Sequence, residues 1–252
     1  MHEPPQSRRC AAVIRCSENS GNTTMDINGT PLSGAIVYVP KGANFFGHRV
    51  RMQDNSAAQL FFEDDDSDVT EVAFDTSLFT DNGLTEALFH KNRDAQLFLD
   101  QCTVSHNAVG AAALIIGDAG ILRIGGSIVG QPGKTVYAGG GDLGAEYALT
   151  NDPGMTNYGT HLLYDAPVFF DAAARDYRLS VTRTGGTVVA SAGIDMRPEV
   201  AGNDLDLDFR IYDQDVGVVA DGDGVRDLGA LEAQPGRRIF VDGFGDRVRL
   251  VD

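Results

Sequence analysis

The amino-acid sequence predicts an all-β protein built as a parallel β-helix, on three observations. The segment VAFDTSLFTDN at residues 72–82 returns as LFLDQCTVSHN at 97–107 and as LRIGGSIVGQP at 122–132, so each copy starts 25 residues after the one before. Within each copy apolar residues alternate with polar ones, which is typical of strands that bury one face. A second short apolar run lies near each copy, so one unit holds several short strands. Units of this length that stack as rungs form a solenoid.

The individual strands follow from the alternation. Apolar residues recur at 72 and 74, at 97 and 99, and at 122 and 124, so we expect these positions to face the core. The segment VRMQDNS, which starts at residue 50, fits the same first-strand pattern upstream of the first full copy. The second apolar runs are GAIVYV (34–39), EALFH (86–90), AAALII (111–116) and KTVYA (134–138). Stacked in parallel at about 4.8 Å, such strands would build one continuous aliphatic column.

The asparagine that closes two of the copies predicts a corner. Asn82 and Asn107 occupy the same place in successive units, and asparagine tolerates the left-handed backbone that a sharp bend needs. Stacked amides can also hydrogen-bond to one another as a ladder. The next position in the series is Pro132. We therefore expect the ladder to stop there and the segment GQPGK (130–134) to end the regular helix.

This reading divides the chain into three parts. Residues 1–140 form β-helix rungs, residues 141–236 form a β-rich module that caps the C-terminal end, and residues 237–252 form a tail after the linker-like segment AQPG. A cap is expected because an open solenoid end exposes a row of unpaired strand edges.

Composition and charge exclude several classes of function. The chain has 252 residues, of which 42% are hydrophobic, and a net charge of −16. Such an acidic surface repels nucleic acid and anionic membranes, so we expect neither as a partner. Three cysteines cannot form a disulfide framework, and no apolar run is long enough for a membrane-spanning helix. We expect a monomer.

Several short motifs resemble bacterial surface proteins. FTDN (79–82) matches the F-x-x-N motif of polymorphic outer-membrane-type repeats, VSHN (104–107) is a looser copy, and GAIV (34–37) resembles their G-G-A-[IVL] motif with serine in place of the first glycine. APVFFDAAARDYRLS (166–180) resembles the P-x-F-x-D-x-x-x-x-D-Y-x-L segment of surface proteins of the choice-of-anchor Q type. AGIDMRPEV (192–200) and DGDGVRDLGALE (221–232) resemble two later segments of the same proteins, in the same order.

The resemblance implies a right-handed β-helix of the pectin-lyase-like class. It also implies an exported protein that is displayed on the bacterial outer surface or released. In that family the helix begins well upstream of these motifs, so the resemblance further implies that the chain is the C-terminal portion of a longer protein.

Two acidic residues at equivalent positions are the first candidates for chemistry. Asp75 and Asp100 lie at the same place in successive units, where stacked carboxylates repel each other unless solvated, protonated or bridged by a cation. They fit an acid–base pair for hydrolysis, a Ca²⁺ site as in polysaccharide lyases, or an ordinary solvent-facing stripe. We expect no arginine or lysine at a neighbouring outward position. His106 aligns with Asp81, which fits either a contact between the two side chains or a lone surface histidine near a turn, and we favour the lone histidine.

The segment DGDGVRDLGALE is the candidate metal site. Asp221, Asp223, Asp227 and Glu232 occupy relative positions 1, 3, 7 and 12 of a loop with two glycines, which resembles the spacing of oxygen ligands in a Ca²⁺ loop. Val225 and Arg226 depart from that pattern, and turns that close the solenoid are the competing interpretation. The protein is expected to require no cofactor, and Ca²⁺ is the one ion that the sequence suggests.

These observations favour a non-enzymatic function. We expect a rigid secreted or cell-surface spacer of adhesin type, with an acidic face that contacts polysaccharide or a host or neighbouring cell. The alternative is a carbohydrate-active enzyme, a polysaccharide lyase or glycoside hydrolase, that uses Asp75 and Asp100. The fold class does not separate the two, because it holds both enzymes and adhesins.

Overall fold

The computed structural model describes residues 11–20, 34–63, 70–164, 166–179, 181–184, 187–190 and 228–231. Its elements are β1 (Ala11–Ser20), β2 (Ala35–Val39), β3 (Asn44–Gln53), β4 (Ser56–Ala57), β5 (Gln59–Glu63), β6 (Glu71–Asp75), β7 (Leu78–Thr80), β8 (Gly83–Leu84), β9 (Phe89–Lys91), β10 (Gln96–Asp100), β11 (Thr103–Ser105), β12 (Ala108–Val109), β13 (Ala113–Gly117), β14 (Ile121–Val129), β15 (Thr135–Gly139), β16 (Asp142–Thr150), β17 (Gly159–Tyr164), β18 (Phe169–Asp171), β19 (Asp176–Leu179), β20 (Val181–Thr184) and β21 (Thr187–Ala190), with short 3₁₀ helices η1 (Pro153–Asn157) and η2 (Ala172–Ala174).

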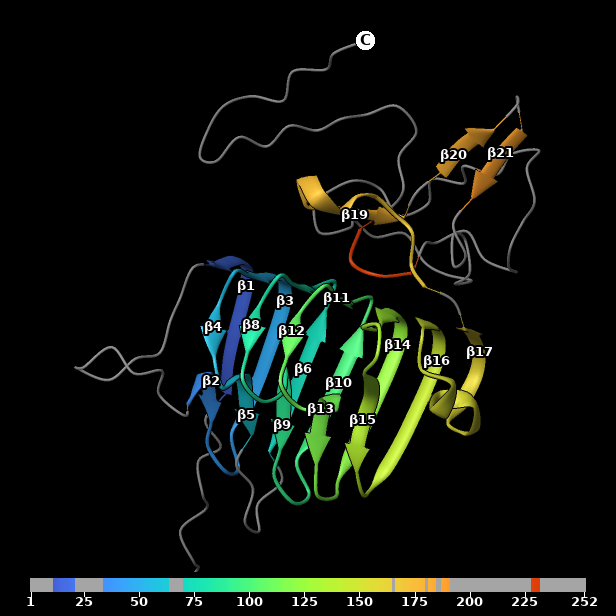
Figure 1. Ribbon diagram of the computed structural model, residues 1–252. Coiled ribbons are helices and arrows are strands. Elements are labelled where there is room, and N and C mark those ends of the chain that lie inside the picture. Colours follow the sequence, from blue (N-terminus) through green and yellow to red (C-terminus); the bar gives the residue numbers. More distant parts are fainter. Residues whose placement is uncertain are drawn as a thin grey trace, which may run out of the picture.

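These strands stack as the rungs of a parallel β-helix, so the predicted fold class is confirmed (Figure 1). Parallel pairing joins β1, β3, β6, β7, β10, β11, β14, β16 and β17 in a long sheet. A short sheet holds β4, β8 and β12, and a return sheet holds β2, β5, β9, β13 and β15. Leu97 lies opposite both Val72 and Leu122 in the long sheet, which is the repeat interval of the sequence expressed as strand register.

A left-handed residue bends the long sheet once in every rung and divides it into two panels. Strand residues before this bend form the first panel, at 44–48, 71–75, 96–100, 121–125 and 142–146, and those after it form the second panel. The bend falls at Arg49, Thr76, Gln101, Gly126, Tyr147 and His161, all with φ between 51° and 55°. Five of the six are not glycine. The stacked strands on either side hold them in a conformation that such residues rarely adopt.

A second left-handed corner precedes each ladder asparagine. We expected Asn82 and Asn107 themselves to take this conformation, and that expectation was wrong. The left-handed residues are Asp81 and His106, with φ of 59° and 55°, and Asp54 one rung earlier, with φ of 56°. The residue before the asparagine makes the bend, and the asparagine then turns its amide into the interior.

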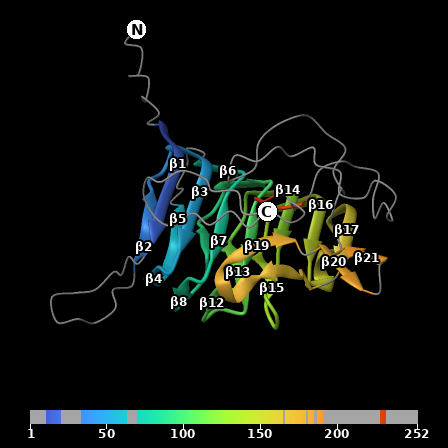
Figure 2. The ribbon, with the colours of Figure 1, turned by 90° about the horizontal axis from the view of Figure 1, so that it is seen from above.

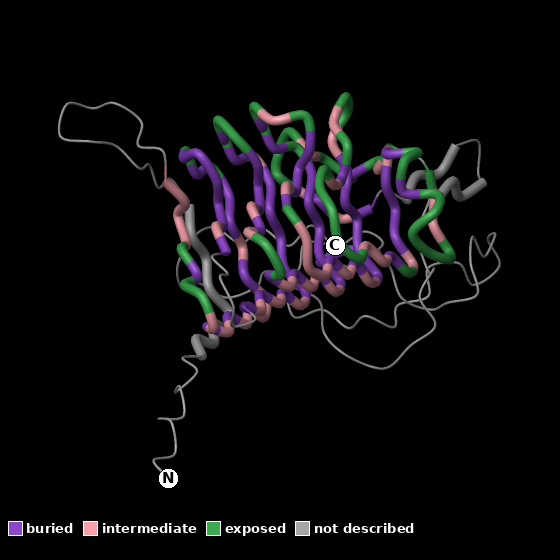
Figure 3. The backbone as a smooth tube through the Cα atoms, turned by 90° about the horizontal axis from the view of Figure 1, so that it is seen from below, coloured by how far each residue is buried: buried purple, intermediate pink, exposed green. Residues whose placement is uncertain are grey.

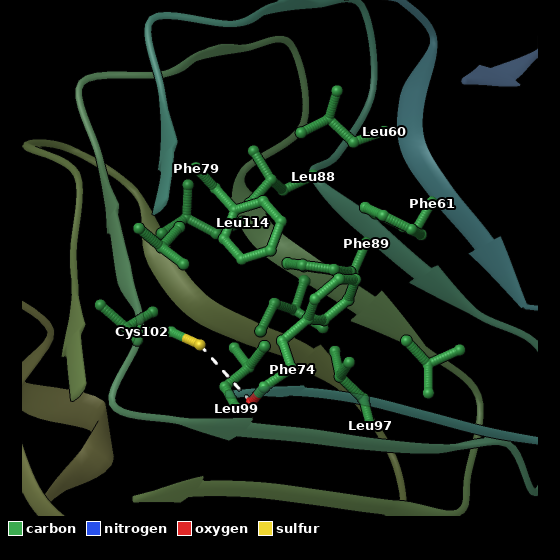
Figure 4. Packing of buried hydrophobic residues seen from close by; sticks show 14 of the residues in the cluster. Leu60, Phe61, Phe74, Phe79, Leu88, Phe89, Leu97, Leu99, Cys102 and Leu114 are labelled. Carbon is green, nitrogen blue, oxygen red and sulfur yellow. Dashed lines mark hydrogen bonds between the residues drawn. The ribbon is translucent and has the colours of Figure 1, made fainter. Parts of the chain in front are cut away.

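The inward side chains form a continuous core. Phe61, Phe74, Phe79 and Phe89 meet in edge-to-face, stacked and tilted pairs, with ring centroids 4.9 to 6.3 Å apart (Figure 4). In later rungs the column continues with aliphatic residues such as Leu97. Figure 3 shows the result along the chain, where buried stretches recur in the stacked strands from β3 to β14 and exposed stretches lie at turns and in later strands such as β17. Burying apolar surface in this way, aromatic in the first rungs and aliphatic in the later ones, is the main stabilising contribution of each rung.

Rung stacking continues past the boundary that the sequence predicted at residue 140. Strand β16 pairs in parallel with β14, and β17 pairs in parallel with β16, so the β-helix runs to Tyr164. The segment GQPGK forms the turn between β14 and β15 rather than the end of the helix. Whether residues 141–236 form a separate module stays a prediction.

Strands β18 and β19 and residues 228–231 pack along the side of the β-helix (Figure 1 and Figure 2). Strands β18 and β19 pair antiparallel and lie over the second panel with residues 228–231. The buried residues of this contact are Leu78, Ile128, Leu149, Phe169, Tyr177, Leu179, Leu228, Ala230 and Leu231. Arg175 reaches Asp54 in an ion pair, so the C-terminal segment extends back to the rung of β3. No helix in the described part of the chain is long and apolar enough to cross a membrane.

Candidate functional site

The first panel presents an outward face that changes from rung to rung. Register places one row of outward residues side by side, namely His48, Asp75, Asp100, Gly125 and Glu146. A second row consists of Phe46, Ala73, Phe98, Arg123 and Gly144. We call these two rows the outer face. Because adjacent strands are about 4.8 Å apart, each side chain can contact those of its two neighbours.

Asp75 is held by neighbours on both carboxylate oxygens. His48 Nδ1 lies 2.8 Å from Asp75 Oδ2, and the Thr76 hydroxyl donates to Asp75 Oδ1 at 2.8 Å. Asp100 lies beside it on the next strand, as the repeat indicated. We expected Val50 to be the first-strand equivalent of Val72, and that was wrong, because Phe45 lies opposite Val72. His48 therefore lies opposite Asp75, at a position that the expected alignment did not reach.

Asp100 borders a shallow pocket of about 480 Å³ on the outer face. The opposite side carries Glu146, and Phe98 and Tyr158 supply aromatic walls. Glycine makes the hollow. A Cβ atom on Gly125 would lie 2.7 Å from Asp100 Oδ1, so the carboxylate leans across the space that a larger residue would fill.

Arg123 lines the pocket, and its side chain lies over Gly144. A Cβ atom on Gly144 would lie only 3.1 Å from Arg123 Cδ, so glycine is what admits the arginine stem. The guanidinium donates to the carbonyl oxygens of Leu122 and Asp142 at 3.1 and 2.8 Å and to the Asp142 carboxylate. We expected no basic residue at a neighbouring outward position, and Arg123 shows that this was wrong. Arg123 stands between two inward-facing residues, Leu122 and Ile124, so the alternation along this strand already indicated that its side chain faces outward.

Glu146 and Tyr158 were missed for a different reason. Both follow the last copy of the repeat, where the strand-to-strand interval shortens and no motif marks the rung. Tyr158 ends the turn η1, whose N-cap Asp152 accepts from the backbone N–H of Gly154 at 2.8 Å. This turn brings the tyrosine, 47% exposed, back to the mouth of the pocket.

The predicted ladder residues hydrogen-bond to each other inside the β-helix. Asn82 Nδ2 donates to Asn107 Oδ1 at 2.8 Å, and Asn55 Nδ2 donates to Asn82 Oδ1 at 2.9 Å. Asn55 extends the ladder one rung upstream of the predicted residues Asn82 and Asn107. At the other end the Gln131 side chain accepts from the Asn107 backbone N–H at 2.9 Å, so a glutamine closes the ladder beside Pro132.

The side chains of His106 and Asp81 form no hydrogen bond or ion pair with each other, and the two residues meet through the Asp81 backbone N–H, which donates to the His106 carbonyl oxygen at 3.2 Å. Tyr177 donates its hydroxyl to the Asp81 carboxylate, 2.7 Å from each oxygen. Burial and this carboxylate together raise the pKa of Tyr177 well above its ordinary value. The His106 ring lies edge-on to Phe169 and Tyr177 and within 3.0 Å of the Ser105 hydroxyl. These groups anchor the C-terminal segment.

A buried acid and a buried base occupy the return sheet. Glu63 and Lys91 lie opposite each other on β5 and β9, and neither is exposed. Both oxygens of the Glu63 side chain lack a hydrogen-bond partner. Burial raises the pKa of Glu63 well above its ordinary value, and the Lys91 ammonium opposes this only in part. Lys91 donates to the Ala119 carbonyl oxygen at 2.7 Å, and burial lowers its pKa.

The predicted Ca²⁺ ligands lie outside the described residues, namely Asp221, Asp223, Asp227 and Glu232. Within the described ranges, no group of three or more histidine, cysteine, aspartate or glutamate side chains is placed to hold a metal ion.

Comparison with known proteins yields no family model, no curated protein and no solved structure that matches this chain.

Proposed function

We propose that the protein is a non-enzymatic secreted or cell-surface β-helix that contacts glycans through the pocket on its outer face. The observation that carries the proposal is the composition of that pocket, where Phe98 and Tyr158 stand next to Asp100, Arg123 and Glu146. Aromatic walls with a few convergent polar groups are the usual composition of a small-ligand site.

The chemistry of a sugar suits these groups. The apolar face of a pyranose ring packs on an aromatic side chain, and its hydroxyls donate to carboxylates or accept from a guanidinium. The open, shallow form of the pocket suits one or two units of a chain that continues on either side along the outer face.

The surface location rests on the motif resemblance. FTDN and the later motifs, which follow it in the same order as in those proteins, favour an exported protein of the polymorphic outer-membrane repeat and choice-of-anchor Q type. The right-handed coil and the pectin-lyase-like class that this resemblance implies belong to the same proposal.

The enzyme alternative has less support at the residues first considered for it. Asp75 already interacts with His48 and Thr76 through both oxygens, so a proton transfer by Asp75 to a substrate would have to break one of these interactions. Asp75 and Asp100 as a hydrolytic pair therefore stay the second candidate.

A pocket-filling substitution tests the proposal. Gly125→Leu adds a side chain where the nearest atom is the movable Asp100 carboxylate, so the fold should survive. Ala73→Leu is the matched control, because it adds a side chain to the outer face at a position that does not line the pocket. We expect the unaltered chain and Ala73→Leu to retain the same ligands on a glycan microarray and Gly125→Leu to lose them.

Two results would contradict the proposal. One is a parent protein that retains no glycan on the array. The other is equal retention by Gly125→Leu and the parent, which would place the binding elsewhere.

A further inference from the structure

The charges around the pocket are unequal. Asp100 and Glu146 face each other across Gly125, one strand to either side of it. The pocket lining contains one cationic side chain, Arg123. The chain as a whole carries a net charge of −16, so the surroundings reinforce a negative potential at the pocket.

The single cation of the lining already has three acceptors. Two are the carbonyl oxygens of Leu122 and Asp142, and the third is the carboxylate of Asp142. A ligand carboxylate that approached Arg123 would compete with Asp142 and would pass close to Asp100 or Glu146. Both effects disfavour a uronic acid at this site.

We propose that the pocket takes an amino sugar whose free amine is protonated, in preference to an N-acetylated sugar or a uronate. The ammonium group lies between Asp100 and Glu146, while the ring packs on Phe98 or Tyr158. Gly125 lies between the two acidic residues in the row and has no side chain to keep the ammonium away from them. This inference rests on the proposed function, because it names the class of glycan that the same pocket selects.

Three oligosaccharides of equal length separate the possibilities. The probes are a β-1,4-linked glucosamine hexamer, its fully N-acetylated counterpart and a galacturonate hexamer, each titrated into the full chain by calorimetry at low and high NaCl. We expect the glucosamine hexamer to bind at least about fivefold more tightly than the acetylated one, because each added charge contact at a partly exposed site is worth a modest factor. High salt should reduce this preference and leave the weaker acetylated ligand unaffected.

Variants assign the preference to the two carboxylates. Asp100→Asn and Glu146→Gln should each bring the affinity for the glucosamine hexamer down towards that for the acetylated one. Glu71→Gln is the control, since it removes a carboxylate from the same panel at a position outside the pocket. Asp142→Ala releases Arg123 and should raise the affinity for the galacturonate hexamer.

The outcomes separate the amine preference from the glycan binding on which it rests. Equal affinity for the acetylated and deacetylated hexamers, unchanged in both pocket variants, would overturn the amine preference and leave glycan binding in place. Tighter binding of galacturonate by the parent protein would also overturn it. If no glycan binds under any condition, the proposed function fails as well.

Discussion

The two faces of the first panel differ in how they follow the repeat. On the inward face, equivalent positions keep apolar residues from rung to rung, such as Val72, Leu97 and Leu122. On the outward face the same strands carry Asp75, then Asp100, then Gly125. Inward residues must fill the space between neighbouring rungs, whereas outward residues meet solvent. Repetition therefore identifies the scaffold, and departure from repetition identifies the candidate site.

The largest loss of stability is expected at the buried asparagine ladder. Asn82→Ala removes an amide that accepts from Asn55 and donates to Met52, Thr80 and Asn107. Buried groups left without partners cost about 1–3 kcal/mol each, so we expect unfolding free energy to fall by roughly 3 kcal/mol. Urea denaturation measures this. Asn44→Ala, at the half-buried first residue of β3, should change stability by less than about 1 kcal/mol, and an equal loss in both would contradict the role of the ladder.

The next effect concerns the buried acid of the return sheet. The pKa of Glu63 is raised in the folded state, so the folded protein keeps this proton at pH values where the unfolded chain has lost it. Stability should then fall as pH rises above 4.5, the ordinary value, by at most about 1.4 kcal/mol per unit until the folded carboxyl ionises. Glu63→Gln should remove this slope. Thermal melts of both proteins between pH 4.5 and 7 provide the measurement, and parallel curves would contradict the prediction.

A smaller effect is expected at the contact between the β-helix and its C-terminal segment. Tyr177→Phe removes the hydrogen bond to Asp81 and leaves the buried ring in place, which should cost about 1–2 kcal/mol. This contact holds residues 166–179 on the second panel. We therefore expect the substitution to accelerate hydrogen exchange in residues 166–179 more than in β10 or β11. Uniform acceleration over the whole β-helix would show instead that the segment and the rungs unfold together.

The smallest effect is expected on the outer face. Asp75→Asn weakens a half-exposed pair with His48, and such pairs contribute about 0–1 kcal/mol. We expect little change in unfolding free energy and no change in glycan binding, since Asp75 does not line the pocket. A loss of binding as large as that of Asp100→Asn would move the site toward Asp75 and revive the pair first considered.

The sequence was informative wherever one position recurs at a constant interval. Alternation placed Val72 and Phe74 in the core, and the interval placed Asp75 beside Asp100. The left-handed corners were predicted one residue too late. Asparagine is the residue type that most readily adopts this conformation, so the prediction chose Asn82 and Asn107, but in the stacked rungs the preceding residues Asp81 and His106 adopt it.

Other features had no periodic signal to read. The lateral position of the C-terminal segment depends on Tyr177 and Asp81, which lie 96 residues apart. The pocket depends on Gly125 and Gly144, whose effect appears only when the side chains of neighbouring rungs are in place. Glu63 and Lys91 could not be paired from sequence, since the two residues lie 28 positions apart and the repeat interval is 25.

The most direct test of the central claim is to locate ligand binding on the two faces. Backbone amide NMR spectra of the full chain, titrated with the glucosamine hexamer, report which residues sense the ligand. The account predicts that shifts concentrate at Phe98, Arg123, Gly125 and Tyr158, and that the ladder residues Asn82 and Asn107 stay unchanged. Shifts that leave the pocket unaffected and cluster elsewhere, for example along the exposed Tyr38 side of the return sheet, would contradict it.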